Sequence, residues 1–159
     1  MEIKVLFVCM GNICRSPTAQ GVFEKLLSET QLAQRIMVDS AGTHAYHVGE
    51  APDHRAQTSA SRRGIDLSKQ RARRVNVEDF HVFDYVIAMD TDNKQSLLTI
   101  CPDEHHPKIT LFMEHASDYE QISVPDPYYG GVSGFEKVLD MIEAASAGLL
   151  ERIKRDREL

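Results

Sequence analysis

An apolar stretch that leads through a polar turn straight into a helix constrains the fold of this chain more than any other feature. Residues 3–8 are apolar and rich in β-branched and aromatic side chains, which predicts a buried strand. Ser16 is a favourable N-cap and Pro17 suits the first helical position, because its missing N–H has no partner to lose there. We therefore expect a helix from this point to about Glu29.

The same order of strand and helix continues along the chain. Further strands are expected at residues 36–40, 85–89 and 108–112, and further helices at residues 53–63, 91–99 and from 133 onward. Strands that alternate with helices form parallel sheets whose two faces are both covered. The sequence thus predicts an α/β fold of three layers, a four-stranded parallel sheet with helices on both faces, in a single domain of residues 1–159.

Local signals mark several helix ends. Gly64 is expected to end the second helix, and Asn76 to cap a short helical turn. Ser133 and Glu136 have the spacing of a capping box, which predicts the start of the last helix. The polar, turn-rich residues between 115 and 131 are expected to be irregular.

Composition and charge exclude several classes of protein. Hydrophobic residues at 42% and charged residues at 26% suit a globular domain with a core. A net charge of −6 provides no field for a polyanion, so we expect no nucleic-acid partner. No apolar run approaches the roughly 20 residues that span a bilayer, so we expect no membrane partner. Three cysteines, an odd number, suit a reducing compartment, and we expect a cytoplasmic protein.

The turn after the first strand has the spacing C-x5-R-S, from Cys9 to Ser16. In a parallel α/β sheet, ligands bind beyond the carboxyl ends of the strands. Five residues can curl so that their backbone N–H groups surround a phosphate-sized anion, and Gly11 is expected to supply backbone geometry closed to other residues. Arg15 can pair bidentately with two phosphate oxygens. The candidate phosphate-binding residues are Met10, Gly11, Asn12, Ile13, Cys14 and Arg15.

The same groups favour the thiolate form of Cys9. Inward N–H donors, a helix N-terminus and a guanidinium all stabilise a negative sulfur. A thiolate at the bottom of an anion cradle is placed for in-line attack on phosphorus. Ser16 is expected to donate a hydrogen bond to that sulfur.

The loop has other interpretations. In one, Cys9 is a buried core thiol, and Ser16 and Pro17 only cap a helix. A nucleotide-binding P-loop fits poorly, since there is no G-K-[ST] and only one glycine. Zinc would need two ligands beyond the two cysteines of the loop, and Cys101, His105 and His106 are the candidates.

A second segment, residues 124–131, supplies a candidate acid. A thiolate that attacks an aryl phosphate expels a phenolate, which leaves better when protonated. Asp126 lies between two prolines that stiffen its backbone, and Tyr128 and Tyr129 offer an aromatic wall for a phenyl ring. Taken alone, the segment is more typical of a Pro/Gly turn that carries two surface tyrosines.

Together, V-C-M-G-N-I-C-R-S-P at the first loop and D-P-Y-Y-G at the second resemble the low-molecular-weight protein tyrosine phosphatases. Shorter matches, among them D-S-A-G-T at residues 39–43 and A-M-D at residues 88–90, extend the resemblance over nearly the whole chain. It implies a phosphatase that hydrolyses phosphotyrosine proteins or aryl phosphates through a phosphocysteine intermediate, with no metal and no organic cofactor. Independently of the resemblance, we expect a monomer or weak self-association through exposed aromatic residues at the entrance.

The resemblance also implies roles for individual residues. Cys9, Arg15 and Asp126 are implied to be catalytic, as nucleophile, phosphate clamp and general acid. Asn12, Ser16 and Ser40 are implied to support the loop, and Cys14 to form a reversible disulfide with Cys9 under oxidation. The substrate entrance is implied to be lined by Tyr46, Tyr128 and Tyr129.

One residue departs from the family's pattern, and one other class of protein remains an alternative. Gln70 stands where the family often has a histidine that supports the loop, and we expect its amide to make similar hydrogen bonds. Arsenate reductases share this loop and fold, but they need further cysteines to relay a disulfide, and residues 82–90 contain none. The basic run of Arg71, Arg73 and Arg74 is expected to be a solvated face.

Overall fold

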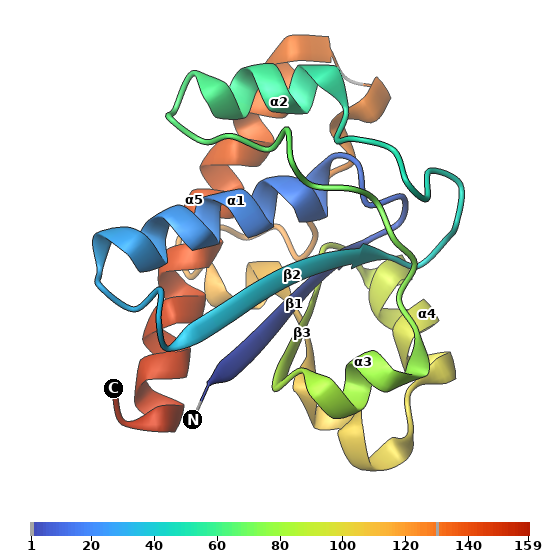
Figure 1. The fold of residues 1–159 in the computed structure, drawn as a ribbon, viewed down its shortest axis with the longest axis vertical. Coiled ribbons are helices and arrows are strands. Elements are labelled where there is room, and N and C mark those ends of the chain that lie inside the picture. Colours follow the sequence, from blue (N-terminus) through green and yellow to red (C-terminus); the bar gives the residue numbers. More distant parts are fainter. Residues whose placement is uncertain (1, 130) are drawn as a thin grey trace.

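The computed structural model describes residues 2–129 and 131–159, except for the side chains of Tyr129 and Val132. Four parallel strands form one sheet in the order β2-β1-β3-β4 (Figure 1). They are β1 (Ile3–Cys9), β2 (Ile36–Gly42), β3 (Tyr85–Ala88) and β4 (Ile109–Leu111). The predicted four-stranded parallel sheet is confirmed.

Strand β1 lies at the centre of the sheet because its middle is apolar on both faces. Val5, Leu6, Phe7 and Val8 are all fully buried. Successive side chains of a strand point to opposite faces, so a strand buried on both sides must be apolar without interruption. The register pairs Cys9 with Gly42 of β2, which places Cys9 at the carboxyl edge of the sheet.

Helices cover both faces, as predicted. Figure 1 shows α1 (Arg15–Glu29), α2 (His54–Ser61) and α5 (Gly131–Arg157) together on one side of the sheet, and α3 (Val77–Val82) and α4 (Thr91–Ile100) on the other. The first face packs around Phe7, whose ring centroid lies 5.6 Å from that of Phe23 and 5.1 Å from that of Phe112. The second face packs Leu6 and Val8 against Phe80 and Leu97.

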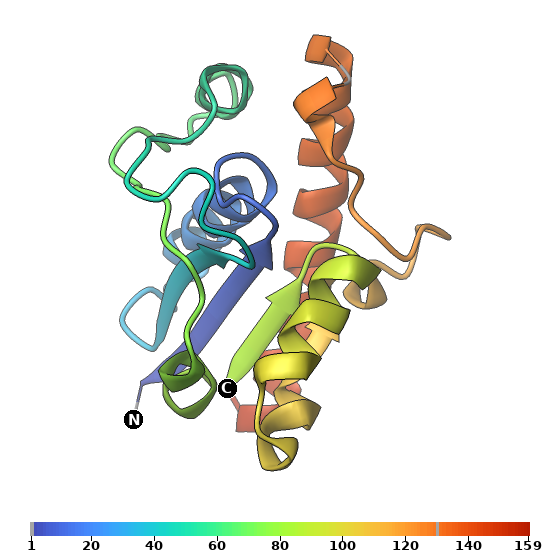
Figure 2. The ribbon, with the colours of Figure 1, turned by 90° about the vertical axis from the view of Figure 1, so that its right-hand side faces the viewer.

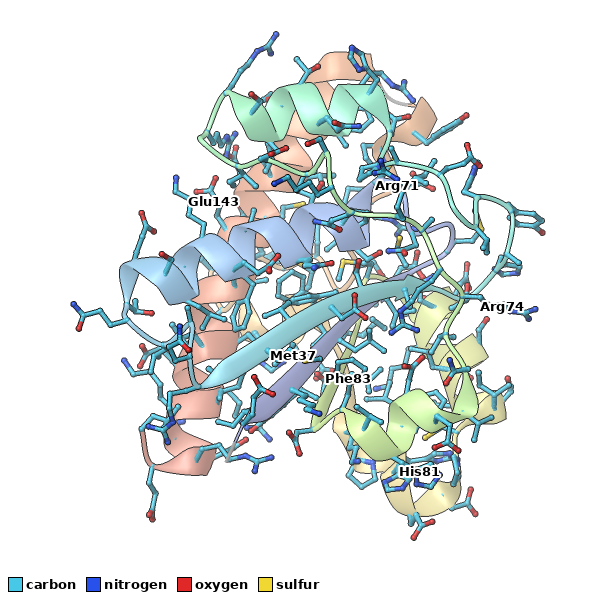
Figure 3. All side chains as sticks on the ribbon, in the orientation of Figure 1. Met37, Arg71, Arg74, His81, Phe83 and Glu143 are labelled. Carbon is cyan, nitrogen blue, oxygen red and sulfur yellow. The ribbon has the colours of Figure 1, made fainter. Side chains whose placement is uncertain are left out.

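Helix α5 is the longest element, and Figure 2 shows it running from the α2 end of the molecule to the end that holds the chain's N-terminus. One apolar face of α5 lies in the core, and charged residues occupy its other faces. Of the helices in the described residues, none combines the length and the apolar character that a membrane span requires.

One predicted helix cap is confirmed, since Asn76 caps α3 through a capping box with Asp79. Asp53, where the second helix was expected to begin, is the N-cap of α2 and accepts a hydrogen bond from the Arg55 N–H. Beyond α2 the chain turns at Gly64, whose φ of 79° lies in the left-handed region that favours glycine.

Two predicted caps are wrong. The N-cap of α1 is Cys14, without a side-chain cap, and Ser16 lies inside the helix with its hydroxyl turned toward Cys9. Helix α5 begins at Gly131, so Ser133 lies inside it, and the Glu136 carboxylate pairs with Arg63 at 3.0 Å instead of closing a capping box. In both places a tertiary contact determines where the side chain points.

Three short 3-10 turns were not predicted. They span Asp103–Lys108, Phe112–His115 and Pro127–Tyr129, the last inside the stretch expected to be irregular. Such turns satisfy only a few backbone groups and carry little periodic signal in a sequence.

The contact between α5 and the Phe112–His115 turn predicts a strong effect of a single methyl group. A Cβ atom added at Gly148 would lie 1.7 Å from the backbone oxygen of His115. We expect Gly148→Ala to lower the free energy of unfolding by about 1–3 kcal/mol or more, since backbone must move.

Gly134→Ala in the same helix is the matched control. Its new Cβ would meet nothing closer than 3.8 Å. We expect it to stabilise the protein by roughly 0.5–1 kcal/mol, because alanine loses less backbone entropy in a helix. Urea unfolding of both variants tests the pair, and equal midpoints would contradict the close approach at Gly148.

Candidate active site

A cavity of about 240 Å³ opens at the carboxyl edge of the sheet, beside Cys9 and the N-terminus of α1. It brings together most of the residues that the sequence singled out. Its lining comprises Cys9, Met10, Gly11, Ile13, Cys14, Arg15, Tyr46, His47, Asp126 and Tyr128. His47, from the segment between β2 and α2, is the one lining residue that the sequence analysis did not assign to the site.

The Cys9 sulfur is almost inaccessible to water and faces two donors. Cys9 is 3% exposed. The Asn12 backbone N–H donates to its Sγ at 3.3 Å, and the Ser16 Oγ lies 3.0 Å from the same atom. When Cys9 is a thiolate, the Ser16 hydroxyl must be the donor, because the ionised sulfur can only accept. The predicted contact between Ser16 and Cys9 is thus present.

Asn12 is the centre of a hydrogen-bond network under the loop. Its Nδ2 donates to Ser16 Oγ at 2.8 Å and to Ser40 Oγ at 3.0 Å, while its Oδ1 accepts from the Arg73 backbone N–H at 3.0 Å. The side chain therefore ties the loop to β2 and to the segment before α3. The residues predicted to support the loop do lie together.

The predicted backbone role of Gly11 is wrong. The left-handed position in the loop belongs to Asn12, whose φ is 58°, whereas Gly11 lies outside that region. Asparagine tolerates this region better than most residues. Gly11 provides space instead, since a Cβ there would lie 3.0 Å from the His47 ring.

Gln70 makes hydrogen bonds beside the loop, as expected of its amide. Its Nε2 donates to the Pro17 carbonyl at 3.0 Å, and its Oε1 lies 3.5 Å from Ser40 Oγ. Ser40 donates a shorter bond, 2.9 Å, to the Gln20 Oε1. Gln70 thus holds the first turn of α1 more firmly than it holds Ser40.

Arg15 is a buried cation with two fixed partners. Its side chain is 4% exposed, and its Nη1 donates to Asp90 Oδ2 at 2.6 Å and to the Val124 carbonyl at 3.0 Å. Burial alone lowers the pKa of a guanidinium, but the nearby Cys9 and Asp90 outweigh it and the pKa of Arg15 is raised. The cavity therefore holds a permanent, oriented positive charge.

Asp90, which pairs with Arg15, is a further residue that sequence reasoning did not assign to the site. It stands two residues beyond β3, the strand that pairs with β1. The signal was available, because the carboxyl ends of neighbouring parallel strands meet at one edge of the sheet. Asp90 also caps α4 by accepting from the Asn93 N–H at 2.7 Å, so its own position is fixed.

Asp126 lines the cavity and belongs to the segment before α5. Its side chain is 36% exposed, its Oδ1 accepts from the Tyr128 N–H at 3.0 Å, and its Oδ2 lies 3.8 Å from Arg15 Nη2. The carboxyl group therefore faces both solvent and the Arg15 guanidinium.

Two of the three tyrosines predicted at the entrance line the cavity. Tyr46 is 70% exposed and stacks on the His44 ring, with centroids 5.2 Å apart. The Arg55 guanidinium lies over the Tyr128 ring, with its Cζ 5.1 Å from the ring centroid. The side chain of Tyr129 lies outside the described residues, so its place at the entrance stays a prediction.

Cys14 is buried at the start of α1, and burial, reinforced by the negative charge of Asp53, raises the pKa of its thiol well above the ordinary range. Cys14 is therefore protonated at neutral pH. Its expected disulfide with Cys9 stays a prediction, because all three cysteines are free here.

The ligands considered for zinc are not brought together. Cys101 packs in the core of the opposite sheet face from Cys9 and Cys14. His106 bonds the Cys101 carbonyl at 2.9 Å, and His105 bonds His81. In residues 2–129 and 131–159, no three His, Cys, Asp or Glu side chains are grouped so as to hold a metal.

Comparison with known proteins adds to this geometry. The model of a family described as low molecular weight phosphotyrosine protein phosphatase matches residues 4–159. The chain belongs to this family. A putative low molecular weight protein-tyrosine-phosphatase of Synechocystis is 41% identical over 155 residues, covering 97% of this chain and 98% of the relative. The low molecular weight phosphotyrosine protein phosphatase of Homo sapiens is 39% identical, covering 94% of each chain.

Solved structures of low molecular weight phosphatases agree with the fold. A protein tyrosine phosphatase from Entamoeba histolytica, crystallised with Hepes in its active site, superposes with a TM-score of 0.95 at 39% identity. The match covers 98% of this chain and 99% of that one. Nothing in these comparisons favours the arsenate reductase alternative.

Gln70→Ala tests the departure from the usual histidine of low molecular weight phosphatases. Removing its bond to Pro17 is expected to lower the free energy of unfolding by about 0.5–1.5 kcal/mol. Because Pro17 lies in the first turn of α1, we also expect inorganic phosphate to bind several-fold more weakly, as measured by competitive inhibition.

Lys108→Met is the control, since Lys108 is also half-buried and donates to the carbonyl of Phe80 at 2.7 Å, in a helix on the other face of the sheet. We expect the same loss of stability and unchanged phosphate inhibition. If Gln70→Ala leaves both stability and kinetics unchanged, Gln70 has no role in supporting the loop.

Proposed function

We propose that this member of the low molecular weight phosphatase family hydrolyses aryl phosphate monoesters such as phosphotyrosine, with Cys9, Arg15 and Asp126 performing the chemistry. The observation that carries the proposal is that a buried sulfur, a buried guanidinium and an exposed carboxyl line one cavity at the end of β1. Each of the three has the environment that its role requires.

In the first step the Cys9 thiolate attacks phosphorus in line with the aryl oxygen. The sulfur–phosphorus bond forms as the phosphorus–oxygen bond breaks, which gives a phosphocysteine and a phenolate. The backbone of residues 10–14 and the Arg15 guanidinium bind the equatorial oxygens, where negative charge must be held. Arg15 needs no reorientation by substrate, because Asp90 and Val124 already fix it.

Asp126 acts in both halves of the reaction. Protonated, it gives its proton to the leaving phenolate; as a carboxylate, it then takes a proton from the water that attacks the phosphocysteine. Its exposure to solvent allows the protons to exchange between turnovers. The second step releases inorganic phosphate and restores the Cys9 thiolate.

The entrance favours an aromatic phosphate ester. Tyr46 and Tyr128 stand at the rim with exposed rings, against which a phenyl group can stack. Phosphotyrosine on a protein and small aryl phosphates both meet this requirement. We further propose that the enzyme works as a monomer or with weak self-association, in the cytoplasm, where Cys9 stays reduced.

Cys9→Ser tests the nucleophile. We expect wild-type protein to release phosphate from an aryl phosphate near pH 6 without added metal, and Cys9→Ser to release none, because a serine hydroxyl is not ionised there. Cys101→Ser is the control, since Cys101 is also buried but lies on the other face of the sheet. Turnover by Cys9→Ser, or none by folded, reduced wild type, would contradict the proposal.

Asp126→Ala tests the acid. We expect a loss of roughly 10²–10⁴-fold in rate with phenyl phosphate, and a smaller loss with nitrophenyl phosphate, whose leaving group needs less protonation. Asp118→Ala, at an exposed aspartate outside the cavity, is the control. Equal losses with both substrates would count against Asp126 as the general acid.

A further inference from the structure

Arg73 contacts the phosphate-binding loop through its backbone, and the expectation that it belongs to a solvated basic face is wrong for this residue. Its N–H donates to Asn12 Oδ1 at 3.0 Å, and its carbonyl accepts from the Gly42 N–H at 2.8 Å. Gly42 is the register partner of Cys9. Arg73 therefore joins the loop and the end of β2 at one point.

The side chain of Arg73 holds that point in place. Its guanidinium pairs bidentately with Asp79, at 3.0 and 3.2 Å, and contacts Asp39 Oδ2 through Nε at 3.1 Å and Nη2 at 3.0 Å. Asp39 lies on β2 and Asp79 in the first turn of α3. Burial lowers the pKa of Arg73, but the two carboxylates outweigh it and the pKa is raised. A half-buried fork between two fixed carboxylates leaves the Arg73 backbone little freedom.

The Arg73 N–H determines which way the Asn12 amide points. An amide presents an acceptor at one end and two donors at the other. With a backbone donor facing one end, that end must be the oxygen, and Nδ2 must face Ser16 and Ser40. Without the Arg73 donor, the amide loses this constraint, and Asn12 also loses compensation for its left-handed backbone.

Ser16 carries the constraint to the nucleophile. Its hydroxyl oxygen accepts from Asn12 Nδ2 at 2.8 Å, which leaves its proton for Cys9 Sγ at 3.0 Å. A serine that did not receive this bond could turn its proton elsewhere, for instance to the Ala41 carbonyl at 3.4 Å. A hydrogen bond to sulfur stabilises the thiolate over the thiol.

We propose that Arg73 is a positioning residue: held by Asp39 and Asp79, it orients Asn12 so that Ser16 donates to the Cys9 thiolate. This rests on the proposed function of Cys9 as nucleophile. It assigns the ion pairs around Arg73 a role in reactivity beyond stability, although Arg73 itself does not line the cavity.

The test compares Arg73→Gln with Arg63→Gln. Arg63 is a matched control, because it also pairs with several carboxylates, those of Glu136, Asp140 and Glu143, but lies away from the loop. Both variants are expected to lower the melting temperature. Only Arg73→Gln is expected to slow alkylation of Cys9 by iodoacetamide at pH 5.5, by about three- to tenfold, because the Cys9 thiolate loses the hydrogen bond from Ser16.

The same variant is expected to lower kcat/KM by a similar factor and to move the acid limb of its pH profile to higher pH. Arg73→Lys, which keeps the charge but not the fork, should restore part of both. In an Asn12→Gly background, Arg73→Gln should cause no further loss of alkylation rate or kcat/KM, because the Asn12 side chain through which it acts is absent. This double variant separates positioning from general destabilisation.

Two outcomes would overturn the inference. Alkylation and kcat/KM that are the same in Arg73→Gln as in Arg63→Gln would reduce Arg73 to a stabilising residue. A full additional effect in the Asn12→Gly background would mean that Arg73 does not act through Asn12. Should Arg73→Gln fail to fold, Asp39→Asn, which leaves the pairing with Asp79, replaces it. Wild-type protein without turnover would instead contradict the proposed function.

Discussion

The buried charge of Arg15 is the constraint around which the site is arranged. A guanidinium taken out of water needs a partner of opposite charge, and removing that partner would leave an uncompensated buried cation. Asp90 and the Val124 carbonyl meet this need, so Arg15 joins the loop after β1 to the segment after β3 and to the one that carries Asp126. Because this ion pair and this hydrogen bond tie the three segments together, Cys9, Arg15 and Asp126 keep their relative positions before substrate arrives.

The fold brings these three segments together. Parallel strands bring their carboxyl ends to one edge, and the apolar run of β1 can only be buried if helices cover both faces. Cys9 then stands at the edge between β2 and β3, with the N-terminus of α1 directly behind it. Cys9, the proposed nucleophile, is thus the last residue of the strand at the centre of the core.

The sequence predicted the features that depend on residues close together in the chain. The strand–loop–helix order and the C-x5-R-S spacing predicted the sheet and the loop. The proline-flanked Asp126 was predicted to be the acid; it does line the cavity, and its role stays a prediction. Sequence reasoning did not reach Asp90, which meets Arg15 across 75 residues, or Arg73, which meets Asn12 across 61. It misplaced the left-handed residue and two helix caps, since glycine and serine carry strong local preferences that long-range hydrogen bonds override here.

The central claim is that phosphate passes through the Cys9 sulfur. Rapid quenching of the wild-type protein during turnover of nitrophenyl phosphate, followed by peptide mass spectrometry, tests it most directly. The account predicts a transient gain of about 80 Da, one phosphoryl group, on the peptide that contains Cys9 and on that side chain alone. A phosphoryl group on another residue, or steady turnover in which no phosphoprotein forms, would contradict it.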